Sequence, residues 1–239
     1  MAGSVLFCHG MPGSAADARL LAAGNPEWRV VPLALLDHAP GDVVKALPGG
    51  HGPAHVVGFS IGAMAAMRLA AQVPERVERL TLVSAAAPLS LGDFLPHMAG
   101  KPVFEMAMRR PRALAAMTWG QGALGRVAPG AMIKALFAQA GEMERTLLAD
   151  PEFRAVLTAG FSESFGAKRA AYLDYLRAYV SDWAGLLAQV RCPVDLWHGS
   201  KDTWSPLAMA TALQAQFEGA SLTMVDGAEH YSTLARVRL

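Results

Sequence analysis

The sequence is poor in charged residues. Asp, Glu, Lys and Arg make up only 17% of its 239 residues, whereas about 25% is usual in globular proteins. Lys and Arg number 21 and Asp and Glu number 20, which gives a net charge of +1. No basic block is present that could follow a phosphate backbone. We therefore expect no nucleic-acid partner.

Cysteine and long hydrophobic runs are also scarce. The two cysteines, Cys8 and Cys192, each lie in an apolar stretch, which favours reduced, buried thiols over a disulfide. The N-terminus has no cationic segment, and the apolar run 5–8 is far shorter than a signal-peptide core or a membrane span. No later run is long enough either. These absences predict a cytoplasmic protein without a membrane span.

Hydrophobic residues are abundant. They make up 53% of the chain, above the roughly 45–50% of a typical globular domain, and this excludes a disordered chain. A length of 239 residues corresponds to one large domain or two small ones, and either can bury a sizeable core. The composition indicates a globular protein with a strongly hydrophobic interior or lid.

Short apolar or β-branched runs alternate with stretches of helical spacing along much of the chain. The runs that resemble strands are 5–8, 28–33, 55–59, 80–84, 194–197 and 222–225. The stretches with helical spacing are 15–23, 41–47, 61–72, 206–217 and the tail after His230. Alternation of this kind predicts an α/β fold with a parallel sheet of about six strands covered by helices on both faces.

The alternation is interrupted between residues 85 and 190, where no run resembles a strand. A structureless loop of that length is improbable in a compact domain, so we expect a helical lid inserted after the fourth strand. The α/β core then comprises residues 1–84 and 191–239. Most of the methionine and aromatic side chains of the lid are expected to form its core, with some lining an apolar pocket. They are Met98, Met106, Met108, Met117, Met132, Met143, Phe94, Phe104, Trp119, Phe137 and Phe161.

The sharpest local motif is Gly-Phe-Ser-Ile-Gly at residues 58–62, a G-x-S-x-G pattern. An apolar run at 54–57 precedes it and a helical stretch at 63–69 follows it. A strand, a sharp turn and a helix are the context that exposes a nucleophilic serine above a sheet. Glycines on both sides let the two backbones approach closely. Ser60 is therefore the candidate nucleophile.

A serine hydroxyl is a weak nucleophile at neutral pH, so it needs a base and an acid that orients the base. Asp202 follows the fifth predicted strand in His-Gly-Ser-Lys-Asp, and His230 follows the sixth in Gly-Ala-Glu-His. Both lie in loops at the carboxyl ends of strands. The chain order Ser60, Asp202, His230 is the order expected of an α/β-hydrolase triad.

Three other acids compete with Asp202 as the partner of His230. Asp195 lies within a predicted strand, whereas Asp226 and Glu229 flank the histidine too closely to approach it from an opposite loop. Loop aspartates also often cap turns. We keep Asp202 as the predicted acid.

Acyl transfer also requires donors for the oxyanion. The glycine-rich turn at residues 9–14 follows the first strand and can aim backbone N–H groups. Because Pro12 has no N–H, the predicted donors are the backbone N–H groups of Met11 and of Ile61, the residue after the nucleophile. His9 is expected to brace this loop.

Taken together, these motifs make the chain resemble the α/β-hydrolase superfamily, in its lidded serine carboxylic-ester-hydrolase branch. The resemblance rests on HGMPG at 9–13, GFSIG at 58–62, HGSKDTWSP at 198–206 and GAEH at 227–230. It implies the strand order 2-1-3-4-5-6 and a lid at 85–190. The serine at position 60 argues against an epoxide hydrolase or haloalkane dehalogenase, which have an acid there.

The motifs predict an enzyme that hydrolyses a small to medium carboxylic ester through an acyl-enzyme on Ser60, His230 and Asp202. No cofactor or metal is needed. His51 and His55 lie in a turn and a strand, where a spacing of four does not place both on one face, so we predict no metal site there. The expected partner is a small-molecule acyl substrate, and a homodimer through the lid stays an alternative.

Other functions remain compatible with the same residues. A thioesterase or a C–C bond hydrolase would use the same triad, and cofactor-free perhydrolysis is a further alternative. A slow-turnover small-molecule receptor, which keeps the triad, is an alternative outside the enzymes. The natural substrate, the pathway and the oligomeric state depend on pocket shape and surface rather than on fold.

Overall fold

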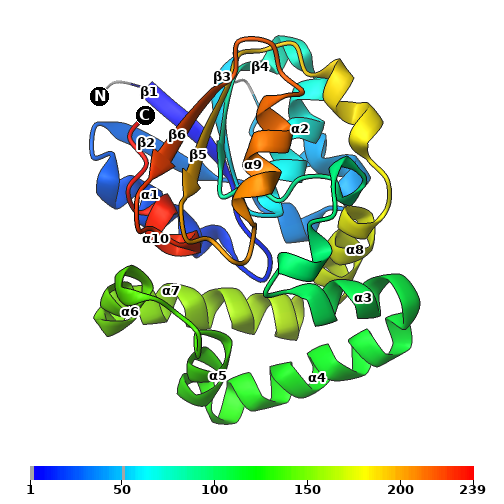
Figure 1. Ribbon diagram of the computed structural model, residues 1–239, viewed down its shortest axis with the longest axis vertical. Coiled ribbons are helices and arrows are strands. Elements are labelled where there is room, and N and C mark those ends of the chain that lie inside the picture. The colour runs from blue at the N-terminus through cyan, green and yellow to red at the C-terminus, as the bar shows by residue number, and fades with distance from the viewer. Residues whose placement is uncertain (1–2, 50–51) are drawn as a thin grey trace.

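The computed structural model describes residues 3–49 and 52–239, and at its centre lies one six-stranded sheet (Figure 1). The strands are β1 (Gly3–Cys8), β2 (Trp28–Pro32), β3 (Ala54–Phe59), β4 (Val77–Val83), β5 (Val194–Gly199) and β6 (Ser221–Val225). Every adjacent pair is parallel, and the order is β2-β1-β3-β4-β5-β6. Both the α/β class and the predicted strand order are confirmed.

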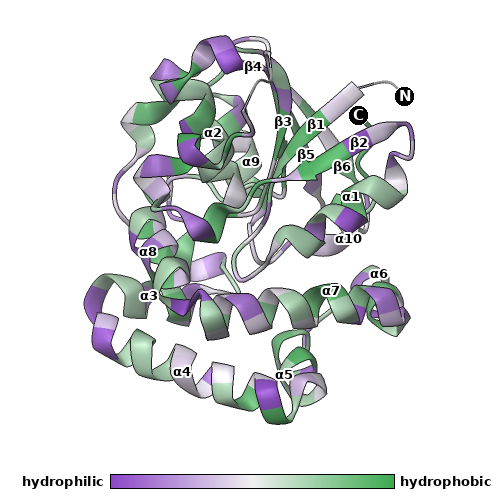
Figure 2. Ribbon diagram, turned by 180° about the vertical axis from the view of Figure 1, so that it is seen from behind, coloured by the Kyte–Doolittle hydropathy of each residue, from purple (hydrophilic) through white to green (hydrophobic). Residues whose placement is uncertain are grey.

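Burial explains why the apolar runs became strands. All six residues of β3 are buried, as are the last four of β1 and of β4. Strands covered on both faces are continuous apolar runs rather than alternating ones. The edge strands β2 and β6 have no fully buried residue. Figure 2 shows the inner strands as the most hydrophobic part of the sheet.

Helices cover both faces of the sheet. The helices α1 (Ala18–Gly24) and α10 (His230–Leu234) lie on one face, and α2 (Gly62–Gln72) and α9 (Leu207–Gln214) lie on the other (Figure 1). Parallel strands are joined by right-handed crossovers. Because the chain runs from β1 toward one edge and from β3 toward the other, its helices fall on opposite faces. The loops after β1 and β3 therefore meet where the strand order reverses, where ligands of such sheets bind.

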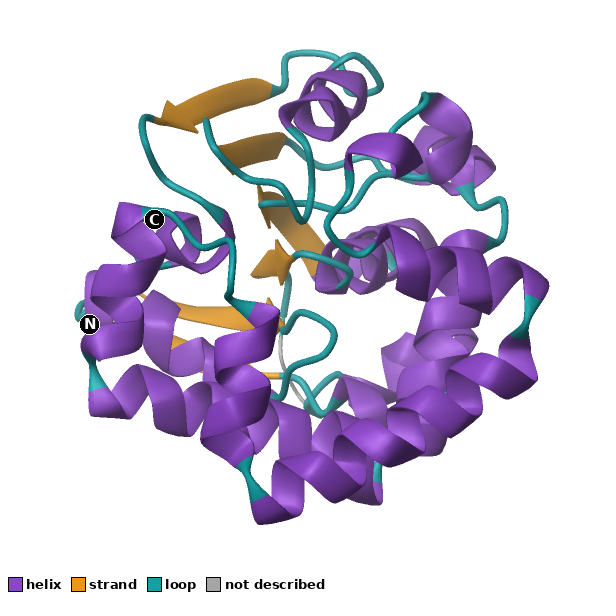
Figure 3. Cartoon of the chain, turned by 60° about the horizontal axis from the view of Figure 1, so that its bottom comes forward, coloured by secondary structure: helices purple, strands orange, loops and turns teal. Residues whose placement is uncertain are grey.

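Six α-helices lie between β4 and β5, and no strand occurs among the described residues of that segment. They are α3 (Lys101–Arg109), α4 (Pro111–Val127), α5 (Pro129–Leu136), α6 (Glu142–Ala149), α7 (Pro151–Ser162) and α8 (Arg169–Val180). We call residues 85–190 the helical insertion. Proline at the first or second position starts four of these helices, which fits its fixed φ and missing N–H. Figure 3 shows helices arranged around the loops that follow the strands.

The methionine and aromatic side chains of the helical insertion are divided between its interior and its outer surface. Phe104 and Phe161 are buried as predicted, but Trp119 is 66% exposed and Met108 is 42% exposed. Trp119 lies on α4, whose Leu114 faces the other helices and is buried. The periodicity of an isolated helix does not show which of its apolar residues meet a neighbour, so the sequence could not tell that Trp119 is one of the exposed side chains.

The sequence also predicted buried, reduced cysteines and no membrane-spanning segment. Both cysteines are free, with Cys8 buried and Cys192 only half-buried, so the expectation of a buried thiol holds for Cys8 alone. None of the helices in the described residues combines the length and the apolar character that a membrane crossing requires.

Candidate active site

Ser60 lies in the sharp turn between β3 and α2. Its φ of 56° is in the left-handed region, which costs a non-glycine residue of order 1 kcal/mol or more. The Ser60 N–H donates to the Val83 carbonyl at 3.0 Å, and the Ser60 carbonyl accepts from the Ala86 N–H at 3.1 Å. These two bonds, one to the last residue of β4 and one to the segment that follows it, hold the strained turn. The structure therefore contains the strand, turn and helix that the motif predicted.

The glycines of this turn are required by space. A Cβ on Gly58 would lie 2.6 Å from the Cα of Ala63, and one on Gly62 would clash with the carbonyl oxygens of Cys8 and His9. The first contact lets α2 pack tightly on β3. The second brings the start of α2 against the loop after β1, which joins two separate motifs into one site.

His230 and Asp202 form a buried hydrogen-bonded pair. The His230 Nδ1 lies 2.8 Å from the Asp202 Oδ2, and the two residues are 3% and 6% exposed. A carboxylate can only accept, so His230 carries its proton on Nδ1 and keeps Nε2 free as a base. The other oxygen, Oδ1, accepts the backbone N–H groups of Trp204 at 2.9 Å and Ser205 at 3.0 Å.

The electrostatics of Asp202 favour its ionised form. Burial by itself raises the pKa of the Asp202 carboxyl, but the charge of His230 and the hydrogen bond from its ring outweigh burial and hold the pKa below its ordinary value. His198 on β5 further stabilises the loop that carries Asp202, because its Nε2 lies 2.8 Å from the Ser205 carbonyl oxygen. Asp202 is thus a fixed anion beside the imidazole.

The three competing acids have other partners. Asp195 pairs with an arginine of β4, Asp226 accepts a hydrogen bond from a serine hydroxyl, and Glu229 accepts a backbone N–H of the helical insertion. Among the four candidates, the carboxylate within hydrogen-bond reach of the His230 ring is that of Asp202.

The two predicted oxyanion donors, Met11 and Ile61, border the same cavity as Ser60. Within residues 3–49 and 52–239, neither backbone N–H donates to a protein acceptor. The ring of His9 is buried and hydrogen-bonds the Gly10 carbonyl at 2.9 Å. Burial lowers the pKa of His9 to about 4. The ring is neutral near pH 7 and bonded within its own loop, as a bracing residue would be.

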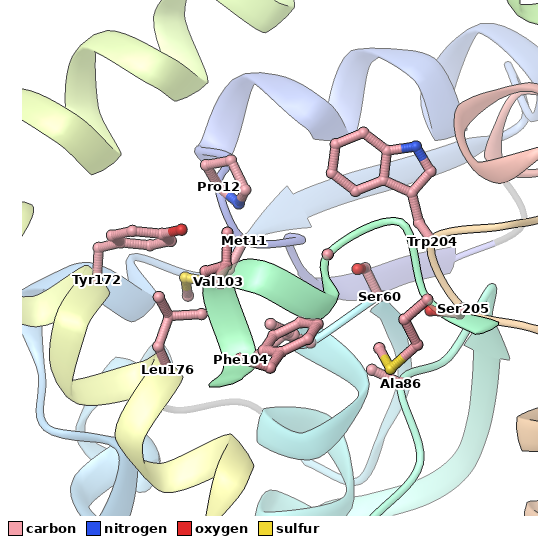
Figure 4. Close-up of a pocket in the computed structure, with 13 residues that line it drawn as sticks. Met11, Pro12, Ser60, Ala86, Val103, Phe104, Tyr172, Leu176, Trp204 and Ser205 are labelled. Carbon is pink, nitrogen blue, oxygen red and sulfur yellow. The ribbon is translucent and has the colours of Figure 1, made fainter. Parts of the chain in front are cut away.

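The cavity above Ser60 is small and apolar. Its volume is ≈ 50 Å³, enough for a few non-hydrogen atoms on the scale where one water needs about 10–15 Å³. The helical insertion supplies one wall (Figure 4). The lining residues, none of which carries a charge, are Met11, Pro12, Ser60, Ile61, Ala86, Met98, Gly100, Val103, Phe104, Tyr172, Leu176, Trp204 and Ser205.

Several further residues contact this site, and two of them, Ser164 and Glu144, lie outside every motif found in the sequence. Ser164 is buried and clamps the loop after β1, because its hydroxyl accepts the Gly13 N–H at 3.1 Å and donates to the Gly13 carbonyl at 3.0 Å. Trp204 stacks on His230 with ring centroids 5.9 Å apart. Glu144 of α6 accepts the Tyr231 N–H at 2.7 Å. Contacts between segments so distant in the chain have no local pattern.

Of the two histidines weighed as metal ligands, His55 lies among the residues that the structure describes. His55 lies on β3 and its Nε2 is 2.8 Å from the Thr81 hydroxyl. His51 lies outside the described residues. Among the residues that are described, no group of three or more His, Cys, Asp or Glu side chains could hold a metal ion.

Solved structures of hydrolases are similar to this chain in fold. Est816, an N-acyl homoserine lactone degrading enzyme, is 19% identical, with 99% of this chain and 89% of that chain covered and a TM-score of 0.64. The enol-lactonase from Burkholderia xenovorans LB400 is 19% identical, with 99% and 87% covered and a TM-score of 0.62. A thermophilic esterase from Thermogutta terrifontis is 18% identical, with 99% and 85% covered and a TM-score of 0.57.

Sequence comparison agrees at the level of the family. None of the curated proteins compared with the chain matches it. The family described as "Alpha/beta hydrolase family" matches residues 5–238, which include every strand and every site residue discussed above except part of β1. With this match and the observed sheet, the chain belongs to the alpha/beta hydrolase family.

Proposed function

We propose that the protein is a serine hydrolase that cleaves small to medium carboxylic esters through an acyl-enzyme on Ser60, His230 and Asp202. The observation that carries the proposal is the buried 2.8 Å contact between His230 Nδ1 and Asp202 Oδ2, at the same sheet edge as a serine strained to a φ of 56°. A nucleophile, an oriented base and an acid are the three groups that acyl transfer needs.

Acylation begins when the Ser60 Oγ attacks the ester carbonyl carbon and the His230 Nε2 takes the hydroxyl proton. Asp202 stabilises the imidazolium and keeps its orientation. The carbonyl oxygen becomes an oxyanion, which accepts hydrogen bonds from the Met11 and Ile61 N–H groups. Each such donor is worth roughly 2.7–4 kcal/mol in the transition state.

The tetrahedral intermediate collapses when its C–O bond to the alcohol breaks and His230 returns the proton to the leaving oxygen. Water then attacks the acyl-enzyme carbonyl while His230 removes one of its protons. Collapse of the second intermediate restores the Ser60 hydroxyl and releases the carboxylic acid. The steps balance without a cofactor.

The cavity supports a small apolar acyl group. Its volume of ≈ 50 Å³ and its uncharged lining favour a short, neutral chain, because burying a charge without a partner is costly. Phe104 and Leu176 come from the helical insertion and close one side. The insertion is therefore proposed to act as a lid that shapes the pocket and excludes water.

Labelling with a fluorophosphonate probe tests the activated serine. The wild-type protein should form one adduct, which peptide mass spectrometry locates on Ser60, and Ser60→Ala should form none. Ser90→Ala is the matched control, because Ser90 is exposed and its variant should label like the wild type. Absence of an adduct on well-folded wild-type protein would contradict the proposal and favour the receptor alternative.

A substrate panel separates the reaction classes. We expect turnover to be highest with p-nitrophenyl esters of short acyl chains and to fall as the chain outgrows the cavity. Acyl-CoA thioesters, lactones and vinylogous diketones complete the panel. A clear preference for thioesters or diketones would replace the esterase assignment while retaining the same triad.

A further inference from the structure

Two glutamates link the helical insertion to the segment that carries His230. One lies in the insertion and accepts a hydrogen bond from that segment, and the other lies in that segment and accepts a hydrogen bond from the insertion. Glu144, in the first turn of α6, accepts the backbone N–H of Tyr231 at 2.7 Å. Glu229, the residue before α10, accepts the backbone N–H of Gly141 with both carboxylate oxygens, at 2.8 and 2.9 Å. Each carboxylate thus satisfies an N–H at the start of the other helix, where such groups lack a helical partner.

The space around these two bonds is closely fitted. A Cβ on Gly141 would lie 2.9 Å from a carboxylate oxygen of Glu229, and a Cβ on Gly227 would lie 3.2 Å from the terminal methyl of Met143. Glu144 is only 3% exposed, and a glutamate this buried is rare unless it has a specific partner. The start of α6 therefore lies directly on residues 227–231.

Tyr231 carries this contact to the catalytic side chain. Its ring packs between Phe153 of the helical insertion, at 5.5 Å between centroids, and Phe59 of β3, at 5.2 Å. Phe59 in turn lies 4.8 Å from the His230 ring. Tyr231 is bonded to His230 by the chain itself, so a shift of the Tyr231 backbone moves the imidazole.

We propose that Glu144 is a positioning residue that fixes His230 through the Tyr231 backbone, so that the base is aligned only while α6 is seated. The proposal rests on the proposed function, because it assigns Glu144 to the same triad. Misplacement of a catalytic group by about 1 Å can cost about 10²-fold in rate. Glu144 itself does not touch the reacting atoms.

Substitutions at Glu144 separate the hydrogen bond from the charge. Glu144→Ala leaves the buried Tyr231 N–H without its acceptor and should lower kcat and the rate of Ser60 phosphonylation by about 10- to 100-fold, with KM nearly unchanged. Glu144→Gln retains an acceptor oxygen at the same place and should restore most of the rate. Glu144→Asp keeps the charge but shortens the side chain, so it should be slow.

The matched control is Glu142, which lies two residues before Glu144 on the same helix. Glu142 is exposed and also in the first turn of α6, so Glu142→Ala removes the same charge from the same helix without touching Tyr231. It should leave kcat and KM as in the wild type. If Glu144→Ala and Glu142→Ala behave alike, Glu144 is not a positioning residue.

Hydrogen exchange tests the contact independently of turnover. In Glu144→Ala, the peptide containing residues 228–234 should exchange faster than in the wild type, and Glu144→Gln should return it close to the wild-type rate. Should Glu144→Ala fail to fold, Glu144→Asp and Glu144→Gln provide the same comparison. Unchanged exchange in 228–234, or a change of kcat below twofold in Glu144→Ala and Glu144→Asp, would overturn the proposal.

The two proposals fail in different ways. If the wild-type protein forms no adduct at Ser60, the proposed function is wrong, and exchange of residues 228–234 still decides whether Glu144 holds the His230 segment. If Ser60 labels normally in the wild type and at the same rate in Glu144→Ala, the positioning role is wrong and the proposed function stands.

Discussion

The α/β core and the helical insertion share one hydrophobic core but differ in how much apolar surface they leave exposed. In the core, the central strands are buried along most of their length and hold the loops that carry Ser60, Asp202 and His230. In the insertion, the inner helices bury large side chains such as Phe153 and Tyr175 in the same hydrophobic core, whereas the outer helix α4 has Trp119 at 66% and Val127 at 82% exposure. We infer that the core supplies the chemical groups, and that the insertion supplies the wall of the pocket and their alignment.

Glycines at buried contacts also differ from glycines on the outer face of the insertion. Gly62 in the core meets backbone carbonyl oxygens on the side where a Cβ would lie, whereas Gly120 on α4 has nothing within 4 Å there. A close-packed interior tolerates no added atom without a shift. The outer face of a helix tolerates it freely.

The largest expected effect comes from changing the predicted acid of the core, because this alters the chemistry of the site without altering its packing. Asp202→Asn should keep the fold but lower kcat on an ester by about 10⁴-fold, because an amide can favour the wrong imidazole tautomer, as in serine proteases. Asp226→Asn in the neighbouring loop is the control and should retain normal turnover. Equal turnover in both variants would show that Asp202 is not the acid.

The next effect concerns the packing of the core. Gly62→Ala should lower the free energy of unfolding by about 3 kcal/mol or more, because overpacking against backbone cannot be relieved by a rotamer change. Urea unfolding followed by circular dichroism measures the change. A loss below about 1 kcal/mol would mean that the turn after β3 and the loop after β1 are looser than described, and would weaken the comparison.

A pH-dependent effect of similar size belongs to the contact between the two regions. Burial raises the pKa of Glu144 from 4.5 to about 7, although the Tyr231 N–H and the His230 charge oppose the rise and Glu229 adds to it. Between pH 4.5 and about 7, the folded protein therefore keeps a proton on Glu144 that the unfolded chain has already lost. The free energy of unfolding consequently falls as the pH rises through this range.

Glu144→Gln removes that titration. The free energy of unfolding of Glu144→Gln relative to the wild type should therefore increase by about 3 kcal/mol between pH 4.5 and pH 7. Urea titrations at pH 5 and pH 8 measure it, with Glu142→Gln as the control that should show no such change. A difference that is independent of pH would show that the Glu144 carboxyl is not destabilised by burial.

The smallest expected effect lies on the outer face of the insertion. Gly120→Ala should stabilise the protein by about 0.5–1 kcal/mol, because alanine is the better helix former and no atom blocks its Cβ. Thermal unfolding would detect a higher Tm. Destabilisation instead would indicate that this face of α4 is covered, and would break the contrast with Gly62.

Much of the core could be predicted because its signals are local. The buried run before Ser60 and the glycines around it specify a strand, a turn and a helix within about fifteen residues. Asp202 and His230 could be assigned because parallel strands end at the same edge of a sheet. The strand at 80–84 was placed a little late, since β4 begins at Val77 with exposed charged residues that conceal it.

The insertion could be predicted only as a set of helices. The sequence did not show which of its methionine and aromatic residues are exposed, and Ser164 and Glu144 were not expected at the site. Glu144 is 87 positions from Tyr231, and Ser164 is 151 from Gly13. No periodicity or motif links residues at such separations.

The sequence by itself determined the α/β class, the positions of the strands and the identity of the candidate nucleophile, base and acid, because these depend on local hydrophobic pattern and turn chemistry. Only the tertiary structure decided how small the cavity above Ser60 is and that Glu144 accepts a backbone hydrogen bond from the segment that carries His230. Those features depend on how residues far apart in the sequence pack against one another, and no local pattern in the sequence records such contacts.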